Sequence, residues 1–150
     1  QKIDFEIDKL PFDNETFDFI TLTSLIEHIN NPKLILGEIN RILKKDGLVI
    51  ITTPNFRYCY KIFYDDPTHV KPYTKKAIER LLHMNEFTVI KTLPFLVNKS
   101  DLFWRLPYPF KIASMLPFKN HQFKNNFLIP NFLKGKSTAM TIVAKKKNKI

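Results

Sequence analysis

The stretch from Leu10 to Asn55 constrains the fold of this chain more than any other feature of its sequence. Residues 17–25, near its start, are rich in aromatic and β-branched side chains, which is typical of a buried strand. Residues 48–53, near its end, form an almost unbroken apolar and β-branched run, which predicts a strand covered on both faces. An amphipathic helix joins the two, so the stretch predicts a βαβ unit with a parallel strand pair.

The helix between these strands has its own start and stop signals. Pro32 provides a start, since proline is favoured in the first helical turn. The apolar residues of one helical face follow at the expected spacing: Ile35, Ile39, Ile42 and Leu43. Lys44 and Lys45 would lie in the last turn, where cations favour the helix dipole, and Gly47 would end the helix.

Three more elements are predicted after Asn55. Thr74 can cap a helix over residues 75–85, and residues 87–93 form a strand candidate. Residues 137–144 form the last strand, in which Met140 and Ile142 share one face. We therefore divide the chain into an α/β core, residues 1–95 and 137–150, and an insertion, residues 96–136, which is much longer than an ordinary connection.

The charges of the chain are concentrated in its second half. Residues 1–86 hold 12 Lys/Arg and 13 Asp/Glu, whereas residues 87–150 hold 12 Lys/Arg and the single acid Asp101. This asymmetry indicates an anionic partner, or a basic compositional bias without functional meaning. The insertion is rich in aromatic and basic residues, and it is interpreted as a self-packed lid, a cap over an acceptor pocket, or a patch in a membrane interface. We expect no nucleic-acid partner, because no recognisable binding module is present.

The composition also bounds the location and the chemistry. No apolar run approaches the roughly 18 residues that span a bilayer, and no signal-peptide pattern is visible. We expect a cytoplasmic protein, with peripheral membrane contact through residues 96–136 as an alternative. A single cysteine, Cys59, excludes an internal disulfide and a cysteine-rich metal site. No base neighbours it in sequence, which favours packing over a nucleophilic role.

Three pieces of the sequence resemble, in order and spacing, the class I S-adenosylmethionine-dependent methyltransferases of the type 11-like group. LPFDNETFD resembles the approach to the family's fourth strand, IEHINNPKLILGEINRILKKDG its next helix and turn, and DPTHVKPYTKKAIERLLHMNEF a later segment. The resemblance implies a partial Rossmann-like α/β sheet of parallel strands with an antiparallel last strand. Gly37, Gly47 and Gly135 form no glycine-rich cofactor loop, so we expect the carboxyl-terminal portion of that domain, with pairing to another chain or a decayed homologue as the alternatives.

The resemblance further implies S-adenosylmethionine as cofactor, bound at the carboxyl ends of the strands. An acidic residue before LPF would accept a hydrogen bond from the adenine amine. Glu6 or Asp4 fills that place, with Ile7 beside the ring. Thr23 and Ser24 would line the methionine side. The transferred methyl group is already activated, so the enzyme mainly positions its reactants and needs no catalytic triad.

The candidate catalytic residues are His28 and His69, which the family fold would bring over one pocket. Imidazole titrates near neutrality and can take a proton from an acceptor, although holding a loop is the structural alternative. Some relatives, the ubiquinone-pathway O-methyltransferases, bind a divalent cation here through a Glu-x-x-Glu-His cluster. Ser24 replaces the first carboxylate of that cluster. Glu27, His28 and His69 could still form a poor site for a hard cation, but magnesium prefers oxygen ligands, so we predict no metal. Asp66 either orients His69 or begins an Asp-Pro turn.

The leading interpretation is therefore methyl transfer from S-adenosylmethionine to an oxygen, nitrogen or carbon atom. The acceptor would be a small or lipid-linked molecule. The alternative is a non-catalytic binding or scaffold module that displays the basic, aromatic insertion.

Overall fold

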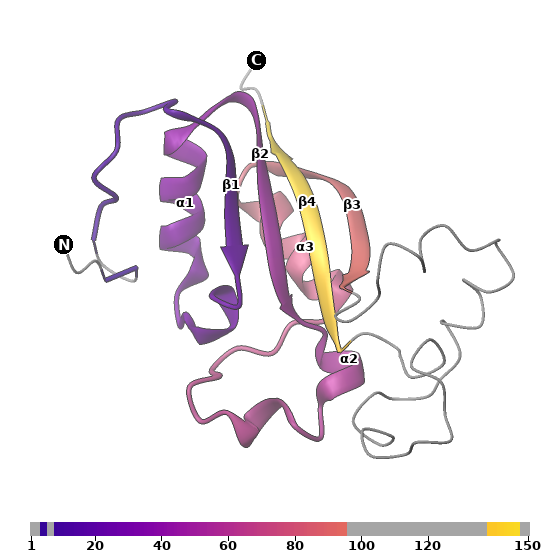
Figure 1. Cartoon of the computed structure of the whole chain (residues 1–150). Helices are drawn as coiled ribbons and strands as arrows, with labels where there is room; N and C mark the ends of the chain where they lie inside the picture. Colours follow the sequence, from indigo (N-terminus) through magenta and orange to yellow (C-terminus); the bar gives the residue numbers. More distant parts are fainter. Residues whose placement is uncertain (1–3, 6–7, 96–137, 148–150) are drawn as a thin grey trace, which may run out of the picture.

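The computed structural model describes residues 4–5, 8–95 and 138–147 (Figure 1). The predicted insertion, residues 96–136, lies outside them. In chain order the elements are β1 (Phe17–Thr23), η1 (Ile26–His28), α1 (Pro32–Ile42), β2 (Leu43–Pro54), α2 (Phe56–Cys59), η2 (Phe63–Asp65), α3 (Lys75–Met84), β3 (Phe87–Phe95) and β4 (Ala139–Lys146). Of these, α2, η1 and η2 were not predicted.

The strands form one sheet in the order β1-β2-β4-β3. Strands β1 and β2 are parallel, whereas β4 runs antiparallel to both of its neighbours. The predicted α/β sheet of parallel strands with an antiparallel last strand is confirmed.

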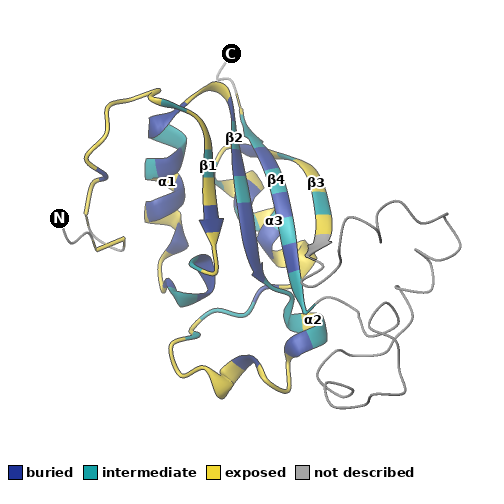
Figure 2. Cartoon of the chain, in the orientation of Figure 1, coloured by how far each residue is buried: buried dark blue, intermediate teal, exposed yellow. Residues whose placement is uncertain are grey.

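A single apolar core joins the sheet to α1 and α3. Ile51 of β2 pairs with Leu22 of β1 and Ile142 of β4, and all three side chains are buried on one face. The helices add the buried stripes Ile35, Leu36, Ile39 and Ile42 of α1 and Ile78 and Leu82 of α3. Figure 2 shows this burial along α1, β2 and β4. Each such side chain contributes about 1.5–3 kcal/mol when fully buried, so this face supplies most of the driving force for folding.

The predicted start of the second helix is confirmed in detail. The side chain of Thr74 accepts a hydrogen bond from Ala77 N at 3.3 Å, one turn into α3. The alternation predicted for the last strand is also present, since Met140, Ile142 and Ala144 of β4 are buried.

Helix α1 ends earlier than predicted. The prediction that Lys44 and Lys45 lie in its last turn and that Gly47 ends it is wrong, because β2 already begins at Leu43. Tertiary hydrogen bonds supply the reason. The helix-terminal carbonyls of Arg41 and Ile42 accept from the backbone N–H groups of residues 15 and 16, at 3.0 and 2.8 Å. The chain entering β1 thus satisfies groups that a glycine cap would otherwise satisfy.

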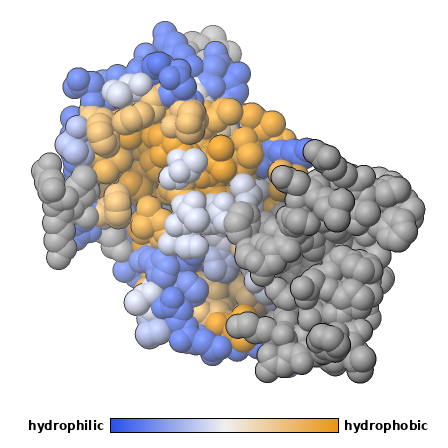
Figure 3. Space-filling model, in the orientation of Figure 1, coloured by the Kyte–Doolittle hydropathy of each residue, from blue (hydrophilic) through white to orange (hydrophobic). Residues whose placement is uncertain are grey.

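The second face of the sheet is more exposed than predicted. Strand β1 is the edge of the described sheet, and Phe19 is 65% exposed. Leu48 and Ile50 of β2 lie on the same face and are half-buried. A buried strand over residues 17–25 is therefore wrong for the described residues. The cover predicted on both faces of residues 48–53 is present only at residues 51–53, which are all buried, because α1 and α3 both contribute to the core on the opposite face. Figure 3 shows the resulting hydrophobic area.

Candidate functional site

The parallel strands β1 and β2 both end in polar residues at the lower edge of the sheet in Figure 1. Thr23 and Ser24 leave β1 and are exposed, and Thr53 lies near the end of β2 and is buried. Ser24 has φ 47°, in the left-handed region that residues other than glycine rarely adopt. Its N–H donates to Thr52 O at 2.9 Å, so this bend both joins the strands and directs the chain into η1.

Glu27, in η1, is the most deeply buried charged residue of this edge, with 0% exposure. Its Oε2 accepts a hydrogen bond from Thr53 Oγ1 at 2.9 Å. Its Oε1 has no hydrogen-bond partner in the described part of the chain. The backbone carbonyl of Glu27 accepts from the N–H groups of Val70 and Lys71, both at 3.0 Å, which fastens the loop after η2 to η1.

His28 and His69 lie beside each other in this fastened loop region. Their ring centroids are 4.7 Å apart. His28 Nδ1 lies 3.0 Å from Thr68 O and 2.9 Å from Thr68 Oγ1. His69 Nδ1 lies 2.6 Å from Phe63 O, and its ring stacks on the Phe63 ring. The structure therefore brings together the two candidate catalytic residues, which are 41 positions apart in sequence.

The Asp66 carboxylate is hydrogen-bonded within its own turn and makes no hydrogen bond to His69. Its carboxylate accepts hydrogen bonds from the backbone N–H of Thr68 at 2.9 Å and from the Thr68 hydroxyl. These bonds hold the pKa of Asp66 below its ordinary value. The distance from Asp66 Oδ2 to His69 Nε2 is 3.8 Å, too long for a hydrogen bond. The resulting chain, Asp66 to Thr68 to His28, fixes the His28 ring through Thr68.

Tyr73 and Cys59 are both buried, and the charge of Glu27 acts on both. Burial, together with the negative charge of Glu27, raises the pKa of Tyr73 to about 12. The Tyr73 hydroxyl is buried without a hydrogen-bond partner among the described residues. Burial raises the pKa of Cys59 to about 11, and its Sγ donates to Asn55 O at 3.2 Å. Cys59 is packed, as the sequence indicated.

The candidate cofactor residues are only partly described. Thr23 and Ser24 lie together at the end of β1, whereas Glu6 and Ile7 lie outside the described residues. Asp4 is exposed in a tight turn, in which Asp8 N donates to Asp4 O at 2.8 Å. The adenine-binding role of these N-terminal residues stays a prediction.

Sequence reasoning gave no role to Thr68 or Tyr73. Both lie in the segment DPTHVKPYT, which the family resemblance already singled out around His69. Their positions in that segment were the indication of a functional role that the sequence offered. The contact of Thr68 with His28 and the effect of the Glu27 charge on Tyr73 depend on the fold, because more than 35 residues separate each pair in the sequence.

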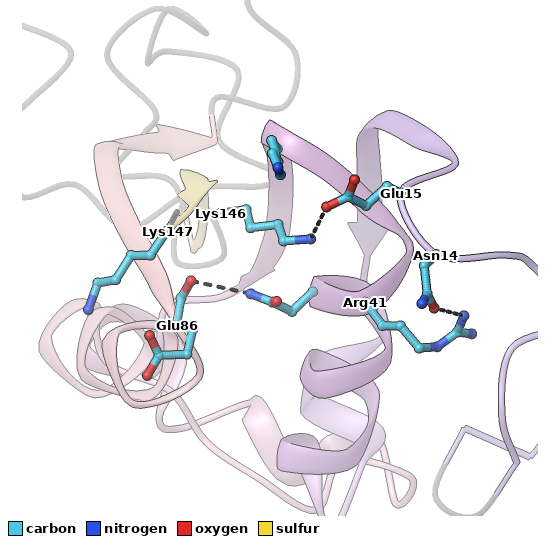
Figure 4. A pocket seen from close by; sticks show the side chains of 8 residues that line it. Asn14, Glu15, Arg41, Glu86, Lys146 and Lys147 are labelled. Carbon is cyan, nitrogen blue, oxygen red and sulfur yellow. Dashed lines mark hydrogen bonds and ion pairs between the residues drawn. The ribbon is translucent and has the colours of Figure 1, made fainter. Parts of the chain in front are cut away.

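A pocket of about 680 Å³ lies at the opposite end of the sheet (Figure 4). It is lined by Asn14, Glu15, Asn40, Arg41, Lys45, Glu86, Lys146 and Lys147. Arg41 Nη1 donates to Asn14 Oδ1 at 3.0 Å, and Lys146 Nζ donates to Leu43 O at 2.7 Å. Arg41 and Lys146 are thus already engaged in hydrogen bonds within the protein. This pocket is therefore a weaker candidate for ligand binding than the edge that carries His28 and His69. Among the described residues, no helix is long and apolar enough to cross a membrane.

Comparison with known proteins identifies what this arrangement resembles. A family model described as a methyltransferase domain matches residues 1–92. A curated but uncharacterised protein of Methanocaldococcus jannaschii is 31% identical over 145 residues, which cover 89% of this chain and 61% of that protein. A demethylmenaquinone methyltransferase of Staphylococcus saprophyticus is 33% identical over 61 residues, or 37% of this chain and 26% of that protein. The chain thus spans less than two thirds of these relatives.

The fold is found in solved structures as well. An S-adenosylmethionine-dependent methyltransferase from Mesorhizobium loti superposes with a TM-score of 0.62 at 12% identity, covering 97% of this chain and 68% of that one. At this identity the likeness concerns the fold alone. This likeness in fold agrees with the observed sheet, in which β1 and β2 are parallel and β4 is antiparallel.

Proposed function

The chain belongs to the class I S-adenosylmethionine-dependent methyltransferase family, and from that premise we propose that its protein transfers a methyl group from S-adenosylmethionine to a small or lipid-linked acceptor. The observation that carries the proposal is the juxtaposition of two features at one sheet edge. The exposed Thr23 and Ser24 end β1, and the paired rings of His28 and His69 lie in the loops next to that end. Open α/β sheets bind their ligands at this edge.

The described residues fit one wall of a cofactor site. Thr23 and Ser24 are exposed where the chain leaves the sheet, and the left-handed bend at Ser24, whose N–H still donates to Thr52 O, directs the chain into η1. We propose that they line the methionine side of S-adenosylmethionine, with Asp4, Glu6 and Ile7 on the adenine side. The cofactor supplies a methyl group on a sulfonium, which is already activated for transfer.

His28 is the proposed proton acceptor, and His69 lies against it. A carbonyl oxygen only accepts hydrogen bonds, so the contact with Thr68 O assigns the proton of His28 to Nδ1. The Nε2 atom then carries the lone pair and can take a proton from the methyl acceptor. The buried Glu27 supports this arrangement, because its carbonyl ties the loop of His69 to η1.

The acceptor class is supported by the names of relatives. Besides the demethylmenaquinone methyltransferase, the chain matches a ubiquinone biosynthesis O-methyltransferase of Glaesserella parasuis, 44% identical over 43 residues. Those names favour a lipid-linked acceptor, and we propose that residues 96–136 contact it or the membrane surface in an otherwise cytoplasmic protein.

Calorimetry with S-adenosylhomocysteine on the full-length protein tests the proposal. We expect binding, weakened about tenfold in Thr23→Val because a hydroxyl contact is lost, which corresponds to about 1.4 kcal/mol. The matched control is Thr88→Val, an exposed threonine on β3 remote from the site, which should bind like the wild type. Absence of binding by the wild type would contradict the proposal.

The alternative is a non-catalytic binding or scaffold module. A full-length protein that binds the cofactor product but transfers no methyl group to any quinone precursor or small acceptor would favour it.

A further inference from the structure

Three side chains that commonly bind metal ions converge at the site. Glu27 and His28 come from η1, and His69 comes from the loop after η2. One potential ligand atom of each lies within 4.8 Å of the other two. The backbone bonds from Val70 and Lys71 to Glu27 O hold the two segments in this relation.

Both imidazoles are oriented as metal ligands usually are. His28 Nδ1 faces Thr68 O, and His69 Nδ1 faces Phe63 O at 2.6 Å. Because a carbonyl cannot donate, both rings carry their proton on Nδ1 and leave the lone pair on Nε2. A hydrogen bond from the second nitrogen to a carbonyl is the usual support of a metal-bound histidine.

The carboxylate of Glu27 is incompletely satisfied. It is fully buried, and only Oε2 has a partner, Thr53 Oγ1. The other oxygen, Oε1, accepts no hydrogen bond from the described residues. An unpaired buried carboxylate oxygen is costly, and a bound cation removes that cost.

We propose that Glu27, His28 and His69 bind one divalent transition-metal ion, with Zn²⁺ as the best match. Two imidazoles and one carboxylate suit Zn²⁺ and its neighbours, whereas Mg²⁺ prefers oxygen ligands. A tetrahedral ion with bonds of about 2.1 Å holds its ligand atoms about 3.4 Å apart, so the groups must close by at most about 1.4 Å. Side-chain rotation provides that movement.

This inference differs from the expectation of no metal that the sequence alone supports. The sequence lacks the first carboxylate of the Glu-x-x-Glu-His cluster, and the fold supplies His69 from a distant loop instead. Ion binding requires only these three side chains and is measured without cofactor or methyl acceptor. An ion bound at His28 Nε2 occupies the lone pair that is proposed to take the proton of the acceptor, so His28 serves one of the two roles at a time.

Titration of the untagged, chelator-treated full-length protein with Zn²⁺ and with Co²⁺ tests the proposal. We expect one ion per chain, tighter binding than for Mg²⁺, and visible Co²⁺ absorption bands that report nitrogen ligands. The substitutions His28→Gln and His69→Gln should each weaken Zn²⁺ binding by about 100-fold or more. The control, His83→Gln, changes an exposed histidine at the end of α3 and should leave the titration unchanged.

Three results would overturn the proposal: no Zn²⁺ or Co²⁺ binding by the wild type, Mg²⁺ binding without Zn²⁺ binding, or wild-type affinity in folded His28→Gln/His69→Gln protein. Circular dichroism establishes the folding of each variant. If a variant fails to fold, the wild-type titration and its Co²⁺ spectrum still decide. Loss of cofactor binding would bear on the proposed function and not on this site.

Discussion

The two ends of the sheet differ in how completely their polar side chains are hydrogen-bonded. At the amino ends of the parallel strands, Arg41 donates to both oxygens of Glu38, at 2.9 and 2.7 Å, and to the carbonyls of Phe12 and Leu10, at 2.7 and 3.0 Å. At the carboxyl ends, Glu27 and Tyr73 each bury a polar atom that has no partner among the described residues.

The two ends therefore have different roles: the end with Arg41 stabilises the fold, and the end with Glu27 is the candidate site. A complete set of charge-assisted hydrogen bonds stabilises the fold, and this one pins the segment before β1 against α1. Arg41 also lowers the pKa of Glu38 by hydrogen bonding. Unsatisfied buried groups are disfavoured in a purely structural region, so their presence at the other end points to ligand binding.

Substitution of Arg41, at the fully hydrogen-bonded end of the sheet, should have the largest effect on stability. Arg41→Met removes every bond of this guanidinium and leaves the half-buried Glu38 carboxylate without it. We expect a clear loss of stability, measured by urea denaturation as a lower urea concentration at the midpoint of unfolding, because several charge-assisted hydrogen bonds are lost together. Lys45→Met, an exposed cation on the same pocket, is the control and should change stability by less than about 0.5 kcal/mol. Equal losses in both variants would refute this account of the arginine.

Gly47 allows a test of the backbone contacts at the same end of the sheet. A Cβ at Gly47 would lie 2.9 Å from Lys44 O and 3.2 Å from Asp18 O, where β2 bulges away from β1. Gly47→Ala should therefore cost about 1–3 kcal/mol, by the same denaturation measurement.

Gly37→Ala is the matched control for that substitution. Beyond the backbone of its own helix, a Cβ at this position of α1 would meet no atom of the described residues within 4 Å. Because alanine also favours helix, we expect a gain of up to about 1 kcal/mol. A destabilised Gly37→Ala or a neutral Gly47→Ala would contradict the contacts described.

The smallest effect is expected at the unsatisfied end. Tyr73→Phe removes a buried hydroxyl that makes no hydrogen bond with the described residues, so stability at neutral pH should change by less than about 1 kcal/mol. Tyr64→Phe, at a residue 60% exposed, provides the control.

The pH dependence makes the same substitution informative. The pKa of Tyr73 rises from its ordinary 10.0 to about 12 in the folded protein, so the folded state holds this proton more tightly than the unfolded state. Its contribution is fully present below pH 10 and is lost as the pH approaches 12. Denaturation between these values should show a flatter decline for Tyr73→Phe than for the wild type. Parallel declines would show that this phenol does not titrate with unfolding.

Much of the fold follows from local patterns. The stripe at residues 35, 39 and 42 predicted α1, and the cap at Thr74 predicted α3, because helical spacing and caps are properties of short segments. The end of α1 at Ile42 was not predictable in this way. Its last carbonyls are satisfied by residues of the approaching strand, which a local pattern does not reveal.

The candidate site shows the same division. The sequence by itself determined the family, the α/β sheet with its antiparallel last strand, and His28 and His69 as candidate residues. Only the tertiary structure decided that Glu27 is fully buried with one oxygen unpaired among the described residues and that Thr68 holds the His28 ring. The family resemblance already implied that His69 lies over the same pocket, and the structure adds the distance of 4.7 Å between the two ring centroids. The physical reason is that hydrogen-bond satisfaction and burial belong to groups brought together from distant segments, whereas periodicity and turn chemistry are set by neighbours in the chain.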